Sequence, residues 1–146
     1  MALRTRLHNY IESLKEEGVL DSQYDHVKSL QPDDDPCFLV DIINNFCNDA
    51  DHSIGELANV LSEPIVDYAK VMTLVCLLKG SSSSIGGCRM AVACRQLHDA
   101  SVNGDLANCC MAYDKLVNEY YYLRDKLKTV HQMERTIMHN EERKKK

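Results

Sequence analysis

One short stretch of the sequence combines residues that could do chemistry at helical spacing. Cys76, Lys79, Gly80 and Ser83 stand at positions i, i+3, i+4 and i+7, which places them on one face of a helix. A nucleophile at position 76 would have the Lys79 ammonium one turn away, where it could stabilise a phosphoryl group. Gly80 would leave space beside that group, although a glycine inside a helix costs about 1 kcal/mol relative to alanine. The alternative is a solvated face with an incidental glycine, and these residues alone favour neither.

Cys76 could itself be the nucleophile. A thiol reacts as its thiolate, and a nearby cation such as Lys79 favours that form. A phosphocysteine or a redox switch at this position is therefore chemically available. The simpler interpretation is that the cysteine fills the position without reacting. The other cysteines stand mostly at core-facing or helix-packing positions and are predicted to be small apolar residues: Cys37, Cys47, Cys88, Cys94, Cys109 and Cys110.

Neither a metal nor a cofactor is expected. The seven cysteines are odd in number and show no disulfide-framework spacing, so free thiols in a reducing compartment are predicted. The sequence contains no CxxC motif. Cys94 and His98 stand four residues apart and could share a metal, but the sequence does not place two further ligands beside them.

Composition indicates a single soluble domain. The chain has 146 residues, 45% of them apolar and 27% charged, with a net charge of −5. That charge argues against general nucleic-acid binding. No stretch approaches ~18 uninterrupted apolar residues, and the first residues lack an apolar signal core, so an intracellular protein without a membrane span is expected.

The periodicity of apolar residues predicts helices throughout. An amphipathic helix should end near Gly18, and a shorter one should follow over about 24–30. Asp35 is expected to cap a long helix with Pro36 in its first turn, ending at the Glu63-Pro64 break. The helix with Cys76 should end around residues 85–87, and two more should span about 89–102 and 105 onward. The inward face of the helix with Cys76 should comprise Val71, Leu74, Val75, Leu78 and Ile85.

This pattern predicts an all-α protein in which the last four helices form an antiparallel four-helix bundle. Residues 1–146 are expected to be one domain. Short helices should occupy about 1–31, the bundle about 36–140, and a basic tail 141–146.

The chain resembles the plant histidine-containing phosphotransfer (HPt) proteins. The most specific segment is Leu-Lys-Gly-Ser-Ser-Ser-Ser-Ile-Gly at 78–86. Further segments fit the family pattern in register: 10–14, 17–24, Leu30-Gln31, Pro36 with Phe38, Glu119-Tyr120, Leu123 and Lys126-Leu127. The resemblance covers nearly the whole chain, and it implies a six-helix fold and a shuttle role between receptor histidine kinases and response regulators.

Position by position, the resemblance implies a member without its phosphoacceptor. Cys76 replaces the phosphorylated histidine, Leu77 replaces a glutamine usual after it, and Leu74 stands where many members have another histidine. Lys79 and Gly80 keep the family's residues. The chain is therefore identified as a pseudo-HPt protein with no catalytic residue. Its expected receiver-docking and phosphoryl-site surface comprises Cys76, Leu77, Lys79, Gly80 and Ser83.

The expected function is binding rather than catalysis. The protein should dock the receiver domains of hybrid sensor kinases and response regulators in a cytokinin-type two-component phosphorelay, carry no phosphate onward, and so inhibit signalling. The resemblance also implies a monomer found in the cytoplasm and the nucleus.

Three alternatives remain open at this stage. The first is an active carrier that uses Cys76 or another acceptor, the second a binder gated by oxidation, and the third a degenerate member without a partner. The other candidate acceptors are not followed by lysine at +3 and glycine at +4, and are more simply surface or helix-end residues: His8, His26, His52, His98, His131 and His139.

Overall fold

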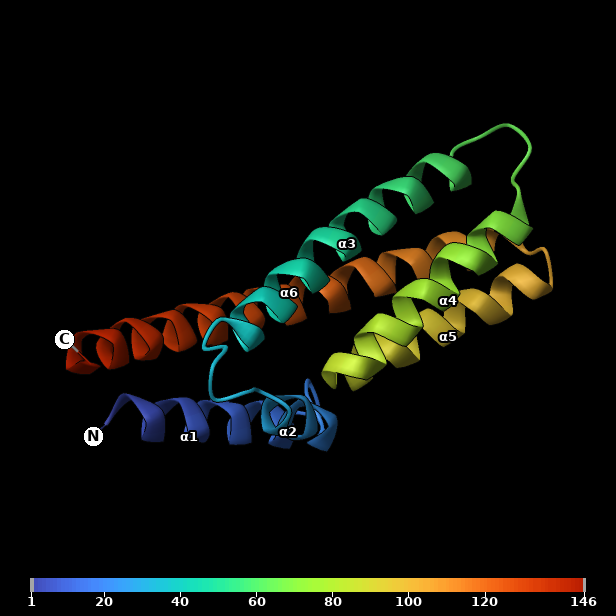
Figure 1. Ribbon diagram of the computed structural model, residues 1–146. Coiled ribbons are helices and arrows are strands. Elements are labelled where there is room, and N and C mark those ends of the chain that lie inside the picture. Colours follow the sequence, from blue (N-terminus) through green and yellow to red (C-terminus); the bar gives the residue numbers. More distant parts are fainter. Residues whose placement is uncertain (1, 146) are drawn as a thin grey trace.

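The computed structural model describes residues 2–145, and these form six helices in chain order (Figure 1). They are α1 (Leu3–Glu16), α2 (Ser22–Ser29), α3 (Phe38–Leu61), α4 (Tyr68–Ile85), α5 (Cys88–Val102) and α6 (Leu106–Lys145). Helices α3 to α6 run alternately back and forth as an antiparallel bundle. The predicted all-α class, with six helices and a C-terminal four-helix bundle, is confirmed.

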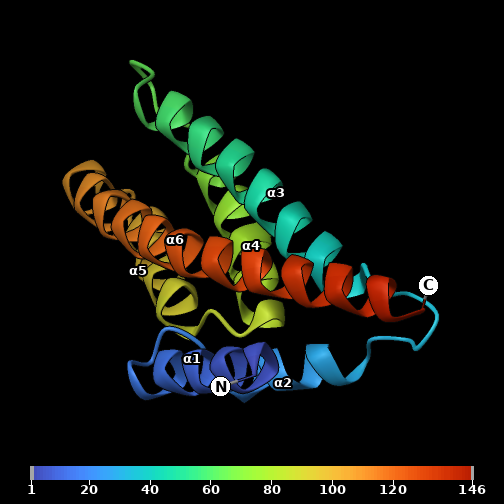
Figure 2. The same ribbon diagram turned by 90° about the vertical axis from the view of Figure 1, so that its left-hand side faces the viewer.

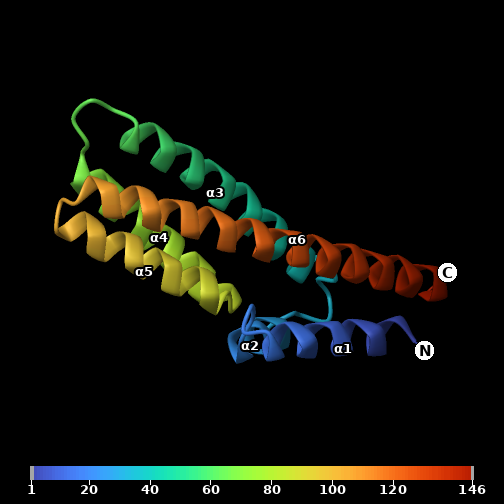
Figure 3. The same ribbon diagram turned by 180° about the vertical axis from the view of Figure 1, so that it is seen from behind.

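Consecutive helices of the bundle pack against one another. Helix α4 contacts α3 and α5, and α6 closes the ring by contacting both α5 and α3. The two short helices lie at one end of this ring, as Figure 2 shows, with α1 packed on α6 and α2 on α4. The C-terminal part of α6 continues beyond the other bundle helices and runs beside α1 (Figure 3).

A buried tyrosine ties α6 to α3 in the middle of the bundle. Tyr120 is fully buried, and its hydroxyl donates to the carbonyl of Cys47 at 2.9 Å and to the Asp51 carboxylate at 2.6 Å. Arg124 donates to the same carboxylate at 2.9 Å. These bonds satisfy a phenol that burial would otherwise leave unpaired, and they set the register of the two helices.

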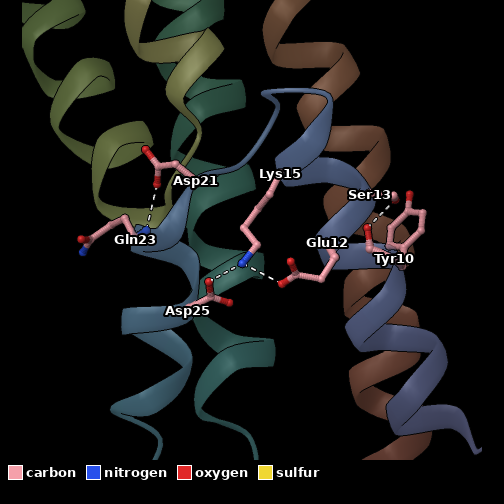
Figure 4. Close-up of polar contacts among 7 residues, drawn as sticks. All are labelled: Tyr10, Glu12, Ser13, Lys15, Asp21, Gln23 and Asp25. Atoms are coloured by element: carbon pink, nitrogen blue, oxygen red, sulfur yellow. Dashed lines mark hydrogen bonds and ion pairs between the residues drawn. The ribbon is translucent and has the colours of Figure 1, made fainter.

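Charged side chains join α1 to α2. The Lys15 ammonium lies 2.7 Å from the carboxylate of Asp25 and 2.7 Å from that of Glu12 (Figure 4). Asp21 caps α2 by accepting from the backbone amide of Gln23 at 2.9 Å. The short helix is thereby fixed at both its N-cap and its side, which compensates for its low intrinsic stability.

The predicted start of α3 is wrong. The helix begins at Phe38, with Cys37 as its N-cap residue and no side-chain cap. Asp35 uses its backbone carbonyl instead, which accepts from the Phe38 amide at 3.3 Å within a turn that contains Pro36. Asp35 stands two residues ahead of the N-cap position, so its carboxylate cannot serve the first-turn amides.

The C-terminal helix continues to Lys145, into the segment expected to be a basic tail, and Lys146 lies outside the described residues. Glu141 in this last part of α6 pairs with Arg4 of α1. Within residues 2–145, none of the helices combines the length and apolar character that a membrane span requires.

Candidate functional site

Helix α4 has one buried face and one exposed face. Its inward residues are Val71, Leu74, Val75, Leu78 and Ile85, all buried as their periodicity predicts. On the outside lie Cys76, Leu77, Lys79, Gly80 and Ser83, all exposed, and these five residues are called the docking face below. The split between the faces follows from helical spacing alone.

The helix is held in place at both ends. Its N-cap Asp67 accepts from the Lys70 amide at 3.1 Å. Its C-cap Gly86 adopts a left-handed conformation with φ of 87°, as the predicted glycine cap requires. The docking face therefore lies on a rigid element rather than on a loop.

Gly80 is exposed and opens the centre of the docking face. A Cβ atom built on it would meet no described heavy atom within 4 Å outside its own helix turn. Nothing in the described fold therefore requires a glycine here, although it lowers the stability of a helix interior by about 1 kcal/mol relative to alanine. The space beside Gly80 is therefore open to an approach from outside the molecule.

Of the four serines after Gly80, three bond back to their own helix. Ser81 and Ser82 donate to the Leu78 carbonyl, at 3.2 and 2.7 Å, and Ser84 donates to the Gly80 carbonyl at 2.8 Å. Ser82 is buried, so its hydroxyl belongs to the core. The hydroxyl of Ser83 makes no hydrogen bond with the described part of the chain, which leaves it free for a partner on the docking face.

A hollow of about 160 Å³ lies beside Cys76, between α4 and α5. Cys76, Lys79 and Val75 line it from α4. The α5 side was not predicted, and it contributes Arg95, His98 and Asp99. Helical spacing would have placed these three residues on one face of α5, but nothing in the sequence aligns that face with Cys76. This hollow is called the α4–α5 hollow.

A second hollow, of about 310 Å³, lies on the other side of the docking face, between α3 and α4. Leu77 stands at its rim with its side chain 63% exposed, next to Ser81. Helix α3 contributes Asp49, His52 and Ser53. The docking face thus has a histidine on either side, and the sequence did not predict that His52 and His98 flank Cys76.

The thiol beneath the docking face is of a different kind from Cys76. Cys94 on α5 is fully buried. Burial raises the pKa of its thiol to about 12, although the nearby Ser82 hydroxyl and the Lys79 charge oppose that shift. Cys94 is therefore a structural thiol. Among the described residues, no cluster of three or more His, Cys, Asp or Glu could hold a metal.

These features define a class of protein. A rigid helical bundle presents one exposed helix face, flanked by two shallow hollows and provided with an open glycine, a cation and a central thiol. None of this forms the deep enclosed pocket in which a small substrate is buried. An exposed helix face of this kind is open to contact by another protein, and an exposed thiol lies at its centre.

Comparisons with known proteins identify the family of this chain. Histidine-containing phosphotransfer protein 2 of rice is 34% identical over 137 residues, covering 93% of this chain and 92% of the rice protein. The crystal structure of a maize histidine-containing phosphotransfer protein matches with a TM-score of 0.86 and 38% identity, covering 93% and 99% of the two chains. Pseudo histidine-containing phosphotransfer protein 6 of Arabidopsis is 29% identical and covers 90% and 86%. No family model matches the chain.

The chain belongs to the plant histidine-containing phosphotransfer proteins, the relay proteins of two-component signalling. Its relatives include both members named as phosphotransfer proteins and members named as pseudo forms. The family therefore places the chain in a phosphorelay, and the site residues must indicate on which side of that division it falls.

Proposed function

We propose that this protein is a pseudo-HPt protein that binds receiver domains without carrying their phosphate. One observation carries the proposal. The docking face keeps an unpaired Lys79 and an open Gly80, but a thiol occupies position 76, where the family resemblance places the phosphoaccepting imidazole. The surface for a partner is present, and the usual acceptor atom is missing.

Binding does not need the acceptor atom. Affinity between proteins comes from a few well-packed contacts at the centre of an interface, and Leu77 offers such a contact at the rim of the α3–α4 hollow. An aliphatic side chain that is 63% exposed gains free energy when a partner covers it, by about 1–2 kcal/mol. The replacement of a family glutamine by Leu77 is therefore compatible with docking.

A protein that docks receivers and transfers nothing competes with true phosphotransfer proteins. The partners we propose are the receiver domains of hybrid sensor kinases and of response regulators in a cytokinin-type relay, met by a monomer in the cytoplasm and the nucleus. The expected output is inhibition of signalling. The family includes relatives named as pseudo forms, at 29 and 30% identity to this chain.

A transfer assay tests the proposal. A receiver domain phosphorylated with radiolabelled phosphate is mixed with the wild-type protein and with Cys76→His. We expect no stable label on the wild type and label on the variant, because Lys79 and Gly80 remain in place beside position 76. Label on the wild type would overturn the proposal. If Cys76→His alone stays unlabelled, Cys76→His/Leu77→Gln tests whether Leu77 blocks the acceptor.

A second candidate function is an active carrier with an unconventional acceptor. His98 favours it, since this imidazole shares the α4–α5 hollow with Cys76 and Lys79 although it comes from another helix. The same assay separates the two acceptors. Label that disappears in His98→Ala and is acid-labile would assign phosphohistidine, whereas acid-stable label that disappears in Cys76→Ala would assign phosphocysteine. Absence of both label and receiver binding would indicate a member without a partner.

A further inference from the structure

The strongest unassigned feature of the molecule is the charge pattern of the α4–α5 hollow. Lys79 and Arg95 enter it from two different helices. Neither has an ion-pair partner among the residues that the structure describes. Other cations of the bundle are neutralised, as Arg89 is by Glu119 at 2.9 Å and Arg124 by Asp51 at 2.9 Å, whereas these two unpaired cations line one hollow.

The remaining groups of the hollow do not neutralise these two cations. Asp99 is the one carboxylate among the lining residues, and its oxygen lies 3.8 Å from His98 Nδ1. It forms no ion pair with Arg95 or Lys79, so one carboxylate stands against two cations. On a chain with a net charge of −5, two unpaired cations beside one exposed thiol are a local excess of positive charge.

We propose that this hollow makes the protein prefer the phosphorylated form of a receiver domain over the unphosphorylated form. The group recognised is the phosphoryl group on the receiver's aspartate, bound by Lys79 and Arg95 while it stays on its carboxylate. The inference rests on the proposed function, because docking at position 76 is what brings that group to the hollow.

The size of the hollow and the thiol support this occupant. A volume of about 160 Å³ corresponds to roughly five waters at ~30 Å³ each, which is room for a tetrahedral anion. A cysteine is shorter than a histidine, so Cys76 does not fill the space in front of the two cations. Charge-assisted hydrogen bonds from lysine and arginine are the usual means of holding phosphoryl oxygens.

The consequence is a protein that traps the activated state of its partner. A true carrier would remove the phosphoryl group and release the receiver. With no acceptor at position 76, the same encounter would stop at binding, and the complex would be most stable while the receiver remains phosphorylated. The inhibitor would then act most strongly when signalling is strongest.

Binding measurements on a purified response-regulator receiver domain test this. The receiver is used with Mg²⁺ alone and with Mg²⁺ plus beryllium fluoride, which forms a stable mimic of aspartyl phosphate that cannot be transferred. For the full-length wild-type chain we expect about tenfold tighter binding to the fluoride-loaded form. Arg95→Ala should reduce that ratio about fivefold, and Arg95→Glu should bring it to about one; the ratio compares the two receiver forms within one variant, so it does not depend on any change in basal docking.

Lys70→Ala is the matched control, because Lys70 is an exposed cation on α4 that lines neither hollow. Its ratio should equal that of the wild type. Equal affinity of the wild type for the two receiver forms would overturn the inference and leave the proposed function intact. An unchanged ratio in Arg95→Glu would overturn it as well. If the wild-type protein bound neither receiver form, the proposed function itself would be overturned.

Inorganic phosphate distinguishes the intended occupant from a general anion site. If millimolar phosphate removes the fluoride-dependent gain but not the basal binding, the anion and the receiver's phosphoryl group share the hollow, as proposed. If phosphate lowers the affinity for both receiver forms equally in wild type and Arg95→Glu, the effect is ionic screening and the assignment to the hollow fails.

Discussion

Helix α4 is open to solvent in its middle and closed against its neighbours at its C-terminal end. A Cβ atom on Gly80 would meet nothing within 4 Å, whereas one on Gly86 would lie 2.8 Å from the backbone nitrogen of Tyr24. A Cβ on Gly87 would lie 2.8 Å from the side chain of Leu123. A side chain would thus find open space at Gly80, whereas the packing leaves no room for one at Gly86 or Gly87.

The closed end holds α2 onto the bundle. The Gly86 carbonyl accepts from the Asp21 amide at 2.9 Å, directly at the N-cap of α2. The buried Ser82 belongs to this end as well, since the Gly87 amide donates to its carbonyl at 2.7 Å. These contacts serve the fold and are needed whether or not the protein transfers phosphate.

The comparison shows what the family motif can tell. Ser82 and residues 85–87 hold the end of α4 in the fold, and they are silent on activity. Only the open part, from Cys76 to Gly80 with Ser83, bears on what the protein does with a partner. A match to the motif across both parts therefore indicates the family. Whether the chain is a carrier or a pseudo form depends on the residue at position 76.

The largest expected effect is at the closed end, on stability. Gly86→Ala should lower the free energy of unfolding by about 3 kcal/mol, because an alanine is strained at φ of 87° and its Cβ would clash with the backbone of Tyr24. Urea denaturation followed by circular dichroism measures the change.

Gly18→Ala is the control for that strain. Gly18 also has a positive φ, of 77°, but the nearest atom to its Cβ would be the Arg89 side chain at 4.0 Å. This variant should lose only about 1 kcal/mol. A Gly86→Ala loss no greater than that of Gly18→Ala would contradict the close packing of α4 on α2.

The next effect, at the open part, should separate stability from binding. Gly80→Gln should raise the free energy of unfolding by about 0.5–1 kcal/mol, because a good helix former replaces glycine in open space. The same variant should weaken receiver binding at least tenfold, since the new side chain occupies the space a partner needs. Urea denaturation and isothermal calorimetry give the two quantities.

Gly55→Gln provides the matched control on α3. Gly55 is exposed, lies inside a helix, has nothing within 4 Å of a Cβ, and lines neither hollow. It should show the gain in stability without the loss of binding. Unchanged binding in Gly80→Gln would mean that Gly80 is incidental, which is the alternative that the sequence left open.

Much of the fold was predictable, because helical periodicity depends only on neighbours along the chain. The two faces of α4 and the glycine C-cap near Gly86 follow from that spacing. The predicted cap of α3 was wrong because Asp35 accepts from the Phe38 amide through its backbone carbonyl and not through its carboxylate. A sequence does not show which oxygen of a residue accepts. The helix actually starts two residues after Pro36, without a side-chain cap.

The site was predictable on one helix and not across helices. Cys76, Lys79, Gly80 and Ser83 share one stripe of a single helix, so their common exposure could be worked out from the spacing. Leu77 was placed with them by the family resemblance alone. Arg95, His98 and Asp99 reach Cys76 only through the packing of α5 on α4. That packing sets the rotation and the axial register of two helices, which depend on side chains throughout the core.

The smallest expected effect concerns the buried thiol of Cys94 on α5, which packs against α4. Burial raises the pKa of Cys94 from an ordinary 9.0 to about 12, so the folded protein keeps this thiol protonated where the unfolded chain would lose the proton. Below pH 9 both states are protonated and Cys94 does not affect stability. As the pH rises from 9 toward 12, the unfolded state gains free energy by ionising, and stability falls by about 1 kcal/mol by pH 10.

Burial also raises the pKa of Cys47 and Cys109, so the wild-type slope contains their contributions, and a difference between variants is needed to isolate Cys94. Cys94→Ala should show a shallower loss of stability between pH 8 and 10 in urea titrations. Met90→Leu, a buried change on the same helix without a titrating group, should keep the wild-type slope. Equal slopes in all three proteins would mean that solvent reaches Cys94 from the α4–α5 hollow. The buried layer around Ser82 and Cys94 would then not be sealed from the exposed face of α4.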